Sequence, residues 1–199
     1  MRVIAGRLRS RRLRASPRGV RPTADRVRES LFAALGDVEG ARVLDLFAGT
    51  GALGIEALSR GASRAVFVER ARASLAVLRG NLADLELGAE SQVLSIDAQR
   101  ALRLLAERKE RFDLVLVDPP YAAGLQAAVL ESLLRLGLVT PGGSVVVERA
   151  KRDPLLLAEG WLRERERTYG DTVLLHLRPD PAFGCPNRPQ EALPQRDGE

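Results

Sequence analysis

The sequence predicts an α/β fold built on a mostly parallel sheet that helices cover on both faces. Two observations lead to this prediction. Between residues 42 and 149 of this 199-residue chain, short apolar segments alternate with segments of helical periodicity. The short segments are apolar at nearly every position, which is typical of strands buried on both faces. A chain of 199 residues has room for one such domain with a small appendage.

The chain begins with a basic segment, residues 1–21, in which two short stretches are candidate strands of a small hairpin. These stretches are residues 3–5 and 11–13. The next segment, RPTADRVRESLFAAL, predicts a helix with Thr23 as its N-cap and Asp25 in its first turn. One face of this helix carries apolar side chains, namely Val27, Leu31, Ala34 and Leu35.

The alternating region then supplies most of the sheet. Its predicted strands are residues 42–47, 64–69, 91–96, 112–117 and 143–148. Its predicted helices are residues 52–59, 72–85, 98–106 and 125–136. A turn is expected at Thr140-Pro141-Gly142-Gly143, directly before the fifth strand.

The end of the chain has a different pattern. Residues 161–168 and 172–177 flank the turn Tyr169-Gly170-Asp171, which predicts an antiparallel hairpin that completes the sheet. Residues 178–199 contain five of the eleven prolines and no periodicity, so we expect a disordered tail. The predicted organisation is a basic arm at 1–21, one domain at 22–177 and a tail at 178–199.

The positive charge is unevenly distributed along the chain. Lys and Arg total 31 against 26 Asp and Glu, and only Lys109 and Lys151 are lysines. The first 30 residues carry ten arginines and two carboxylates, a local charge of +8, whereas the rest of the chain carries −3. A nearly neutral body with a basic arm indicates an anionic partner such as nucleic acid.

Composition also excludes several classes of site. One cysteine and one histidine are too few for a disulfide framework or a Cys- or His-based metal centre. We therefore expect no metal, a structural role for His176 and no role for Cys185. Asn81 and Trp161 are interpreted as helix surface and packing. No apolar run approaches the roughly 20 residues of a membrane span, so the protein is expected to be cytoplasmic and without membrane contact. We also expect it to be a monomer.

A glycine-rich turn follows the first predicted strand of the alternating region. Gly49, Gly51 and Gly54 form a G-x-G-x-x-G pattern that opens a helix, and Glu69 ends the next strand 20 positions after Gly49. In this context the glycines allow close approach of a nucleoside-containing cofactor, and the carboxylate accepts its ribose hydroxyls.

Two further carboxylates indicate which cofactor it is. Asp45, directly before the glycines, would repel a pyrophosphate but suits the ammonium group of S-adenosylmethionine. Asp97 follows the third strand, where it suits an adenine amine. It equally suits the N-cap of the helix that begins at Ala98, and both roles are compatible.

The turn Asp118-Pro119-Pro120-Tyr121 follows the fourth and most apolar strand. The exocyclic amine of a nucleobase is a poor nucleophile because its lone pair is delocalised into the ring. The Asp118 carboxylate and a backbone carbonyl, that of Pro119, could accept its two N–H groups and favour attack on a sulfonium methyl. The prolines hold the turn rigid, and Tyr121 offers a face for an extruded base.

Together these segments resemble the RsmD family of bacterial 16S ribosomal RNA guanine-N2 methyltransferases. The resemblance rests on MRVIAGRLRSRRL, RPTADRVRESLF, LDLFAGTGALGIEALSRGA, VFVER and LVDPPY, in this order, and spans about residues 1–177. It implies a class I methyltransferase Rossmann-like fold, with a seven-stranded sheet whose last strand is antiparallel. The implied substrate is the guanine at position 966 of 16S rRNA, on an assembled or assembling small subunit.

The resemblance and the motifs together give a set of candidate site residues. Asp118, Pro119, Pro120 and Tyr121 are expected to bind the amine. The residues expected around S-adenosylmethionine are Thr23, Asp25, Arg26, Asp45, Phe47, Ala48, Gly49, Thr50, Gly51, Glu69, Arg70, Asp97 and Ala98. Those expected to bind RNA are Arg2, Arg7, Arg9, Arg11, Arg12 and Arg14.

Three other functions fit parts of the pattern. An adenine-N6 methyltransferase acting on DNA or RNA would use the same Asp-Pro-Pro-Tyr turn. A nicotinamide-dependent oxidoreductase would use the glycine turn but would leave Asp45 and Asp118 without a role. A non-catalytic RNA-binding module would need none of the carboxylates.

Overall fold

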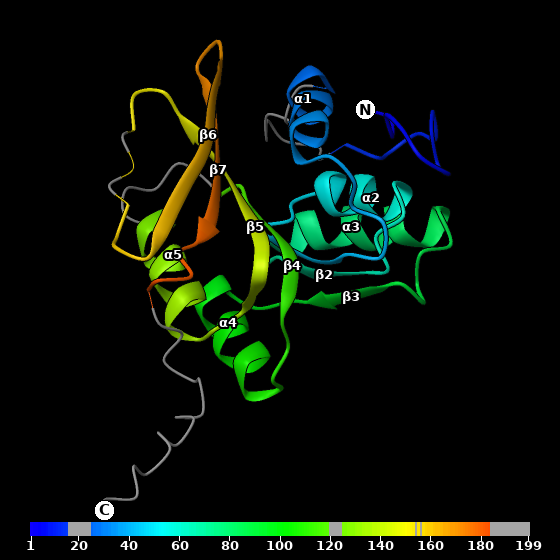
Figure 1. Cartoon of the computed structure of the whole chain (residues 1–199). Coiled ribbons are helices and arrows are strands. Elements are labelled where there is room, and N and C mark those ends of the chain that lie inside the picture. Colours follow the sequence, from blue (N-terminus) through cyan, green and yellow to red (C-terminus); the bar gives the residue numbers. More distant parts are fainter. Residues whose placement is uncertain (16–24, 120–124, 154, 156, 184–199) are drawn as a thin grey trace, which may run out of the picture.

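The structure is a computed structural model, and it describes residues 1–15, 25–119, 125–153, 155 and 157–183. Thr23, Pro120, Tyr121 and Cys185 lie outside the described residues, as do most of the expected tail and part of the basic arm. Seven strands form one sheet in the order β3-β2-β1-β4-β5-β7-β6 (Figure 1). The strands are β1 Arg42–Leu46, β2 Arg64–Val68, β3 Ser91–Leu94, β4 Phe112–Val117, β5 Val139–Ala150, β6 Trp161–Tyr169 and β7 Thr172–Pro179.

The first five strands are parallel, and β7 runs antiparallel between β5 and β6. This arrangement confirms the predicted mostly parallel seven-stranded sheet with an antiparallel last strand. The helices also agree with the sequence within one or two residues at their ends. They are α1 Asp25–Leu35, α2 Ala52–Ser59, α3 Arg72–Asp84, α4 Ala98–Glu107 and α5 Leu125–Arg135.

Helices cover both faces of the sheet, and each face has its own apolar core (Figure 1). On one face, α1, α2 and α3 pack with residues of the arm, including Val3, Leu8 and Leu13. On the other face, α4 and α5 pack against alternate residues of the same strands. Burial on both faces explains why β1, β2 and β4 are apolar at most positions in the sequence.

One predicted turn lies inside a strand instead. The sequence predicts a turn over Thr140-Pro141-Gly142-Gly143 before the fifth strand, but β5 already begins at Val139. The pairing advances from Phe112↔Val139 to Leu114↔Ser144, so the extra residues of β5 form an irregularity in the ladder. Pro141 cannot donate to a ladder and Gly142 has a φ of 81°, which is why this segment leaves the regular pairing.

The arm and α1 also differ in detail from the prediction. The arm folds back on itself through a single antiparallel bridge, Arg2↔Arg12, rather than through two regular strands. The buried face of α1 consists of Val27, Arg28, Leu31 and Phe32, whereas Ala34 and Leu35 are only partly buried. Arg28 therefore takes an inward position that its charge gave no reason to expect.

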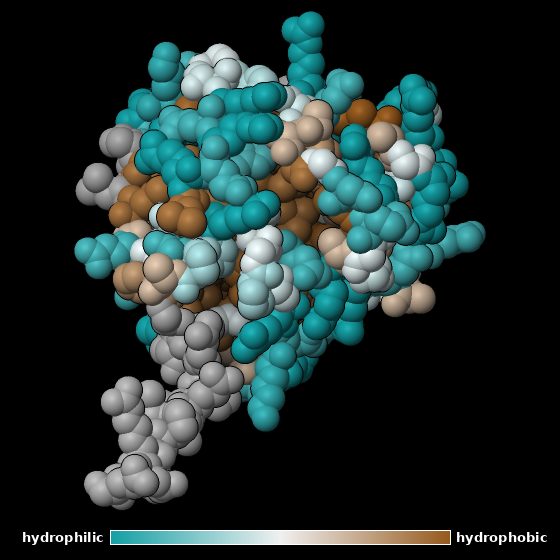
Figure 2. All heavy atoms as spheres, in the orientation of Figure 1, coloured by the Kyte–Doolittle hydropathy of each residue, from teal (hydrophilic) through white to brown (hydrophobic). Residues whose placement is uncertain are grey.

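Over much of the face seen in Figure 1 the surface is hydrophilic (Figure 2). The edge strand β6 contributes to it with exposed charged residues from Arg163 to Arg167. Charged side chains on an edge strand discourage pairing with another chain. Among the described residues, no helix combines the length and apolar character needed to cross a membrane.

Candidate active site

Four carboxylates stand at the ends of four neighbouring strands. Asp45 is the last residue but one of β1, and Glu69, Asp97 and Asp118 follow β2, β3 and β4. Because these strands are parallel and adjacent in the order β3-β2-β1-β4, the four residues share one edge of the sheet. With neighbouring strands about 4.8 Å apart, the row spans about 14 Å. The carboxyl edge of an open parallel sheet is where such folds bind ligands.

The glycine turn is shaped by residues with positive φ. Phe47, Gly49 and Gly51 have φ values of 65°, 57° and 82°. A Cβ added at Gly51 would lie 2.4 Å from Leu78 Cδ1, so this glycine allows α3 to pack against the turn. Among the described residues, a Cβ at Gly49 would meet only the Phe47 carbonyl oxygen, at 3.9 Å. The described part of the chain therefore leaves room beside the Gly49 backbone, as a turn that closely approaches a ligand requires.

Asp45 is buried beneath this turn with 1% of its surface exposed. Its Oδ2 accepts a hydrogen bond from the Gly54 N–H at 2.9 Å, inside the first turn of α2. Burial raises the pKa of Asp45 to about 7, and the negative charge of Glu69 adds to this effect, although the Gly54 N–H opposes it. A carboxylate that is costly to ionise by itself becomes favourable beside a cationic ligand group.

Glu69, which follows β2, connects the end of that strand to the glycine turn that follows β1. Its Oε2 accepts the Gly49 N–H at 2.9 Å, and its Oε1 accepts the N–H groups of Arg70 and Ala71 at 2.7 Å. A carboxylate offers about four acceptor positions, so Glu69 retains capacity for a ligand hydroxyl. Its orientation is fixed by the backbone before any ligand arrives.

Asp97 is the N-cap of α4, and its Oδ1 accepts the Arg100 N–H at 2.9 Å. The N-cap interpretation is therefore confirmed. The Asp97 side chain still lies at the same edge of the sheet as Glu69 and Asp45, one strand beyond β2. Ala98, the first residue of α4, is buried.

Of the Asp-Pro-Pro-Tyr turn, the structure describes Asp118 and Pro119. Asp118 is partly buried and Pro119 is buried. Asp118 lies two positions after Leu116, which belongs to the core under α1, α2 and α3. Strand alternation predicts that its side chain continues on this face of the sheet, beside the glycine turn that follows β1.

The arm lies against α2 and α3 rather than extending into solvent. Glu56 of α2, 1% exposed, accepts the N–H groups of Ile4 and Ala5 at 2.8 and 3.0 Å. Its carboxylate also lies 2.8 Å from Arg60 Nε and 3.6 Å from the Nε of the fully buried Arg28. Burial lowers the pKa of Arg28, and Glu56 opposes this effect most strongly.

The six candidate RNA-binding arginines fall into two groups. Four have polar partners within the protein: Arg2 with the Ser10 carbonyl, Arg7 with Glu90, Arg11 with the Asp84 carbonyl and Arg14 with the Asp84 carboxylate. Arg9 and Arg12 are exposed and form no ion pair within the described part of the chain. Asp25 and Arg26 of α1 are exposed as well, and Asp25 lies 3.1 Å from Arg28.

Sequence reasoning missed three residues, Arg28, Glu56 and Asn81. The expectation that Asn81 lies on a helix surface is wrong, because it is 1% exposed and hydrogen-bonded to Arg14 and Thr50. The signal available in the sequence was a polar residue at a position where the helical pattern calls for an apolar one. Glu56 within the apolar helix ALGIEALS is the clearest of the three.

His176 lies in β7 with 5% of its surface exposed. Burial lowers its pKa, and the positive charge of Arg165 on the neighbouring strand adds to this effect. Its burial within the sheet agrees with the structural role expected for it.

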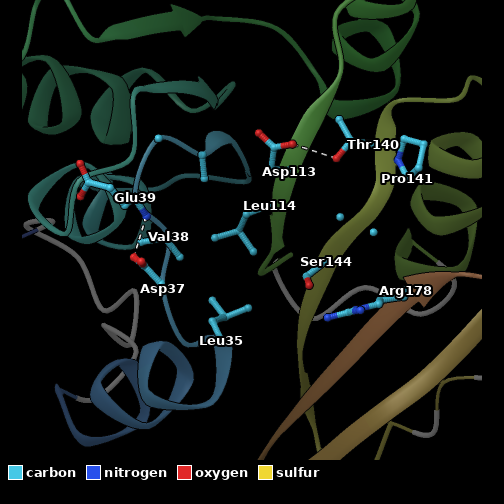
Figure 3. A pocket seen from close by; sticks show the side chains of 14 residues that line it. Leu35, Asp37, Val38, Glu39, Asp113, Leu114, Thr140, Pro141, Ser144 and Arg178 are labelled. Atoms are coloured by element: carbon cyan, nitrogen blue, oxygen red, sulfur yellow. Dashed lines mark hydrogen bonds between the residues drawn. The ribbon is translucent and has the colours of Figure 1, made fainter.

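The opposite edge of the sheet carries an open groove of about 480 Å³ (Figure 3). It lies where β1 and β4 begin, between Asp37 and Glu39 on one side and Thr140, Ser144 and Arg178 on the other. None of the predicted site residues that the structure describes lines it. Within the described ranges, no three His, Cys, Asp or Glu side chains gather as a metal site would require.

Comparison with known proteins gives a consistent result. The sequence model of the family described as "Conserved hypothetical protein 95" matches residues 1–178. The Escherichia coli (strain K12) protein named Ribosomal RNA small subunit methyltransferase D is 39% identical over 177 residues, 87% of each chain. The Haemophilus influenzae protein of the same name is 34% identical over 172 residues, covering 85% of this chain and 89% of its own.

A solved structure also resembles the chain over most of its length. A hypothetical protein of Thermus thermophilus superimposes with a TM-score of 0.76 and 34% identity. The superposition covers 88% of this chain and 98% of that protein.

Proposed function

The chain belongs to the family described as conserved hypothetical protein 95, to which the RsmD ribosomal RNA methyltransferases belong, and on this premise we propose that it methylates ribosomal RNA with S-adenosylmethionine. The supporting observation is the single sheet edge that gathers the glycine turn, Glu69, Asp45 and Asp118. Two relatives of nearly the same length, 34 and 39% identical, carry rRNA methyltransferase names. A pyrophosphate cofactor is disfavoured at this edge because buried Asp45 lies directly under the turn.

The residues present fit S-adenosylmethionine, which supplies an electrophilic sulfonium methyl when bound. Glu69, already oriented by the Gly49 N–H, binds the ribose hydroxyls. Asp45 stabilises the ammonium group, directly or through water, and Asp97 accepts from the adenine amine. The other residues assigned to the cofactor in this proposal are Phe47, Ala48, Thr50, Gly51, Arg70 and Ala98, together with Thr23, Asp25 and Arg26 of the upstream segment.

The proposed nucleophile is the N2 amine of the guanine at position 966 in 16S rRNA. Asp118 accepts one N–H of this amine and the Pro119 carbonyl accepts the other, which makes the nitrogen lone pair available for attack. Pro120 fixes the turn and Tyr121 stacks on the base after it leaves its helix. Catalysis then rests on positioning and electrostatics, without a covalent enzyme intermediate.

RNA binding is assigned to the arm. Its residues Arg9 and Arg12 are exposed and form no ion pair with the described residues. Arg2, Arg7, Arg11 and Arg14 have protein partners, so in this proposal they hold the arm in shape and add positive potential around it. The protein is proposed to act as a monomer on assembled or assembling small subunits in the cytoplasm.

The test is methyl transfer from labelled S-adenosylmethionine to three substrates: small ribosomal subunits, protein-free 16S rRNA and duplex DNA. After digestion to nucleosides, we expect label in N2-methylguanosine from the rRNA substrates and no label from duplex DNA. The Asp118→Ala variant serves as the matched control. Label in N6-methyladenine would instead establish the adenine-N6 alternative, which uses the same turn.

A further inference from the structure

The strongest link between the arm and the glycine turn is a single buried side chain, Asn81 of α3. Its Oδ1 accepts the Arg14 N–H at 2.7 Å, and its Nδ2 donates to the Arg14 carbonyl at 3.3 Å and to the Thr50 carbonyl at 2.9 Å. We propose that Asn81 is a positioning residue that couples docking of the arm to binding of the cofactor. This inference rests on the proposed function, since it assigns the turn to the cofactor and the arm to rRNA.

The chemistry of the amide explains why asparagine suits this position. The group must accept from one N–H and donate to two carbonyl oxygens, and an amide offers an acceptor oxygen and two N–H donors. The reverse orientation would set Oδ1 against two carbonyl oxygens, so the hydrogen bonds define the orientation of the amide. An aspartate of the same size would keep the bond to Arg14 N–H but would repel the Thr50 carbonyl.

On the cofactor side, Asn81 holds the middle of the glycine turn. Thr50 stands between Gly49, whose N–H bonds to Glu69, and Gly51, against which Leu78 of α3 packs. Glu69 and Asn81 thus hold two peptide groups of one turn, the one before Gly49 and the one after Thr50, from two different segments of the chain. A shift of Asn81 would move the backbone of the turn next to Gly49, beside which the described residues leave room.

On the arm side, Arg14 contacts α3 at other residues besides Asn81. Its guanidinium forms two hydrogen bonds of 2.8 Å to the Asp84 carboxylate, one helical turn after Asn81. A Cβ at Gly80 would lie 2.7 Å from Arg14 Nη1, so the arm crosses the helix in direct contact. The Asp84 ion pair is exposed and contributes little, which leaves the buried Asn81 bonds as the specific attachment.

Coupling of this kind is reciprocal: if a docked arm raises cofactor affinity, bound cofactor must favour the docked arm by the same factor. Bound rRNA that holds Arg9 and Arg12 would act in the same direction. Cofactor and rRNA are therefore expected to bind cooperatively, with Asn81 as the physical connection.

The first test needs no RNA. Deuterium uptake of residues 1–15 is compared with and without S-adenosylhomocysteine in the full-length protein. In the wild type we expect the ligand to slow deuterium uptake in the arm by at least about 5-fold, which is the low end of typical coupling factors. In Asn81→Ala the ligand should change the uptake by less than about 2-fold. Asp84→Asn, which removes only the exposed ion pair, is the matched control and should retain the ligand effect.

Asn81→Asp is the second variant, and it keeps the acceptor for the Arg14 N–H but removes the donors to the Arg14 and Thr50 carbonyls. It should retain more of the basal protection of the arm than Asn81→Ala but lose the dependence on ligand. Calorimetry measures S-adenosylhomocysteine binding to each variant at a concentration that saturates the wild type. If either Asn81 variant retains the wild-type ligand effect on the arm, the inference is wrong.

A third measurement separates the inference from the proposed function. The affinity of the wild type for an rRNA fragment is measured with and without S-adenosylhomocysteine, and a gain of at least about 5-fold is expected, reduced to below about 2-fold in Asn81→Ala. If the wild type binds no S-adenosylhomocysteine, the proposed function fails. If it binds the ligand and methylates rRNA but the two ligands bind independently, only the coupling through Asn81 is overturned.

Discussion

Buried ionisable groups define this molecule at the scale of single residues. Asp45 is enclosed with a backbone hydrogen bond from Gly54, and Glu56 and Arg28 form a buried pair whose other partners include backbone groups of the arm. Burying such groups costs free energy. In this protein each of them holds a neighbouring backbone segment through hydrogen bonds. Asp45 is oriented toward the cofactor turn, whereas Glu56 and Arg28 organise the arm.

Asp45 gives a prediction about pH. Its pKa of about 7 lies above its value in the unfolded chain, so protonated Asp45 stabilises the fold at low pH and this contribution is lost as the pH rises toward 7. Asp45→Asn keeps an acceptor for Gly54 but does not titrate. Between pH 5 and 8 its free energy of unfolding should rise by about 2.5 kcal/mol relative to the wild type. Urea unfolding at both pH values checks this, and parallel profiles would contradict it.

Asp118 gives a prediction about catalysis. Asp118→Ala removes one acceptor for the base amine, and methyl transfer to small subunits should fall about 100-fold or more. Affinity for S-adenosylhomocysteine, measured by calorimetry, should change by a factor of less than about 3, because Glu69 and Asp45 remain. Unchanged turnover would remove Asp118 from the mechanism.

At the scale of elements, α2 and α3 each serve two purposes. Their apolar faces complete the core. Their polar side chains Glu56, Ser59 and Asn81 accept hydrogen bonds from backbone N–H groups of the arm. The arm is therefore held mostly through its main chain, and side chains such as Arg9 and Arg12 remain exposed. An arm fixed in this way can present cations to RNA at a lower cost in conformational entropy than a free tail.

The two groups of arginines should differ in their effect on RNA binding. Replacing Arg9 and Arg12 together by alanine should reduce the salt slope of log K for an rRNA fragment by about 1.4, since each phosphate contact to a single strand contributes roughly 0.7. Arg14→Ala is the matched control, because Arg14 is already paired with Asp84, and should change the slope by less than about 0.5. Equal salt slopes for all three proteins would show that Arg9 and Arg12 do not contact RNA phosphates.

At the scale of the whole molecule, the sheet order brings four separate strand ends together. The order β3-β2-β1-β4 turns positions as far apart in the chain as Asp45 and Asp118 into neighbours. The groove at the opposite edge has none of these residues, so its size alone gives no reason to assign the chemistry to it. Function follows the side chains at the carboxyl edge.

Ligand binding at that edge should stabilise the whole domain. At about 100 times its dissociation constant, a ligand specific for the native state contributes about 2.7 kcal/mol. For a chain of this size this corresponds to a rise in Tm of about 5–10 °C. S-adenosylhomocysteine should produce this shift in a thermal scan, and NAD at the same concentration should produce none. The reverse result would favour the nicotinamide alternative.

The sequence by itself determined most of the strands and helices, their order along the chain and the identity of the carboxylates at the strand ends. It could do so because strand and helix periodicity, glycine turns and the Asp-Pro turn are local patterns, set by a few consecutive residues. It also indicated that Asp97 suits an N-cap, which the bond to Arg100 confirms. It did not predict the single bridge of the arm or the early start of β5.

Only the tertiary structure decided how the arm lies and which polar residues hold it. Arg28, Glu56 and Asn81 are buried because residues 26 to 67 positions away along the chain meet them, as Arg14 meets Asn81 and Ile4 meets Glu56. No local pattern encodes such partners, since a polar residue on a helix is ordinarily at the surface. For the same reason the arginines near the start of the chain look alike in the sequence, and the fold alone separates those that fasten the arm from those left exposed.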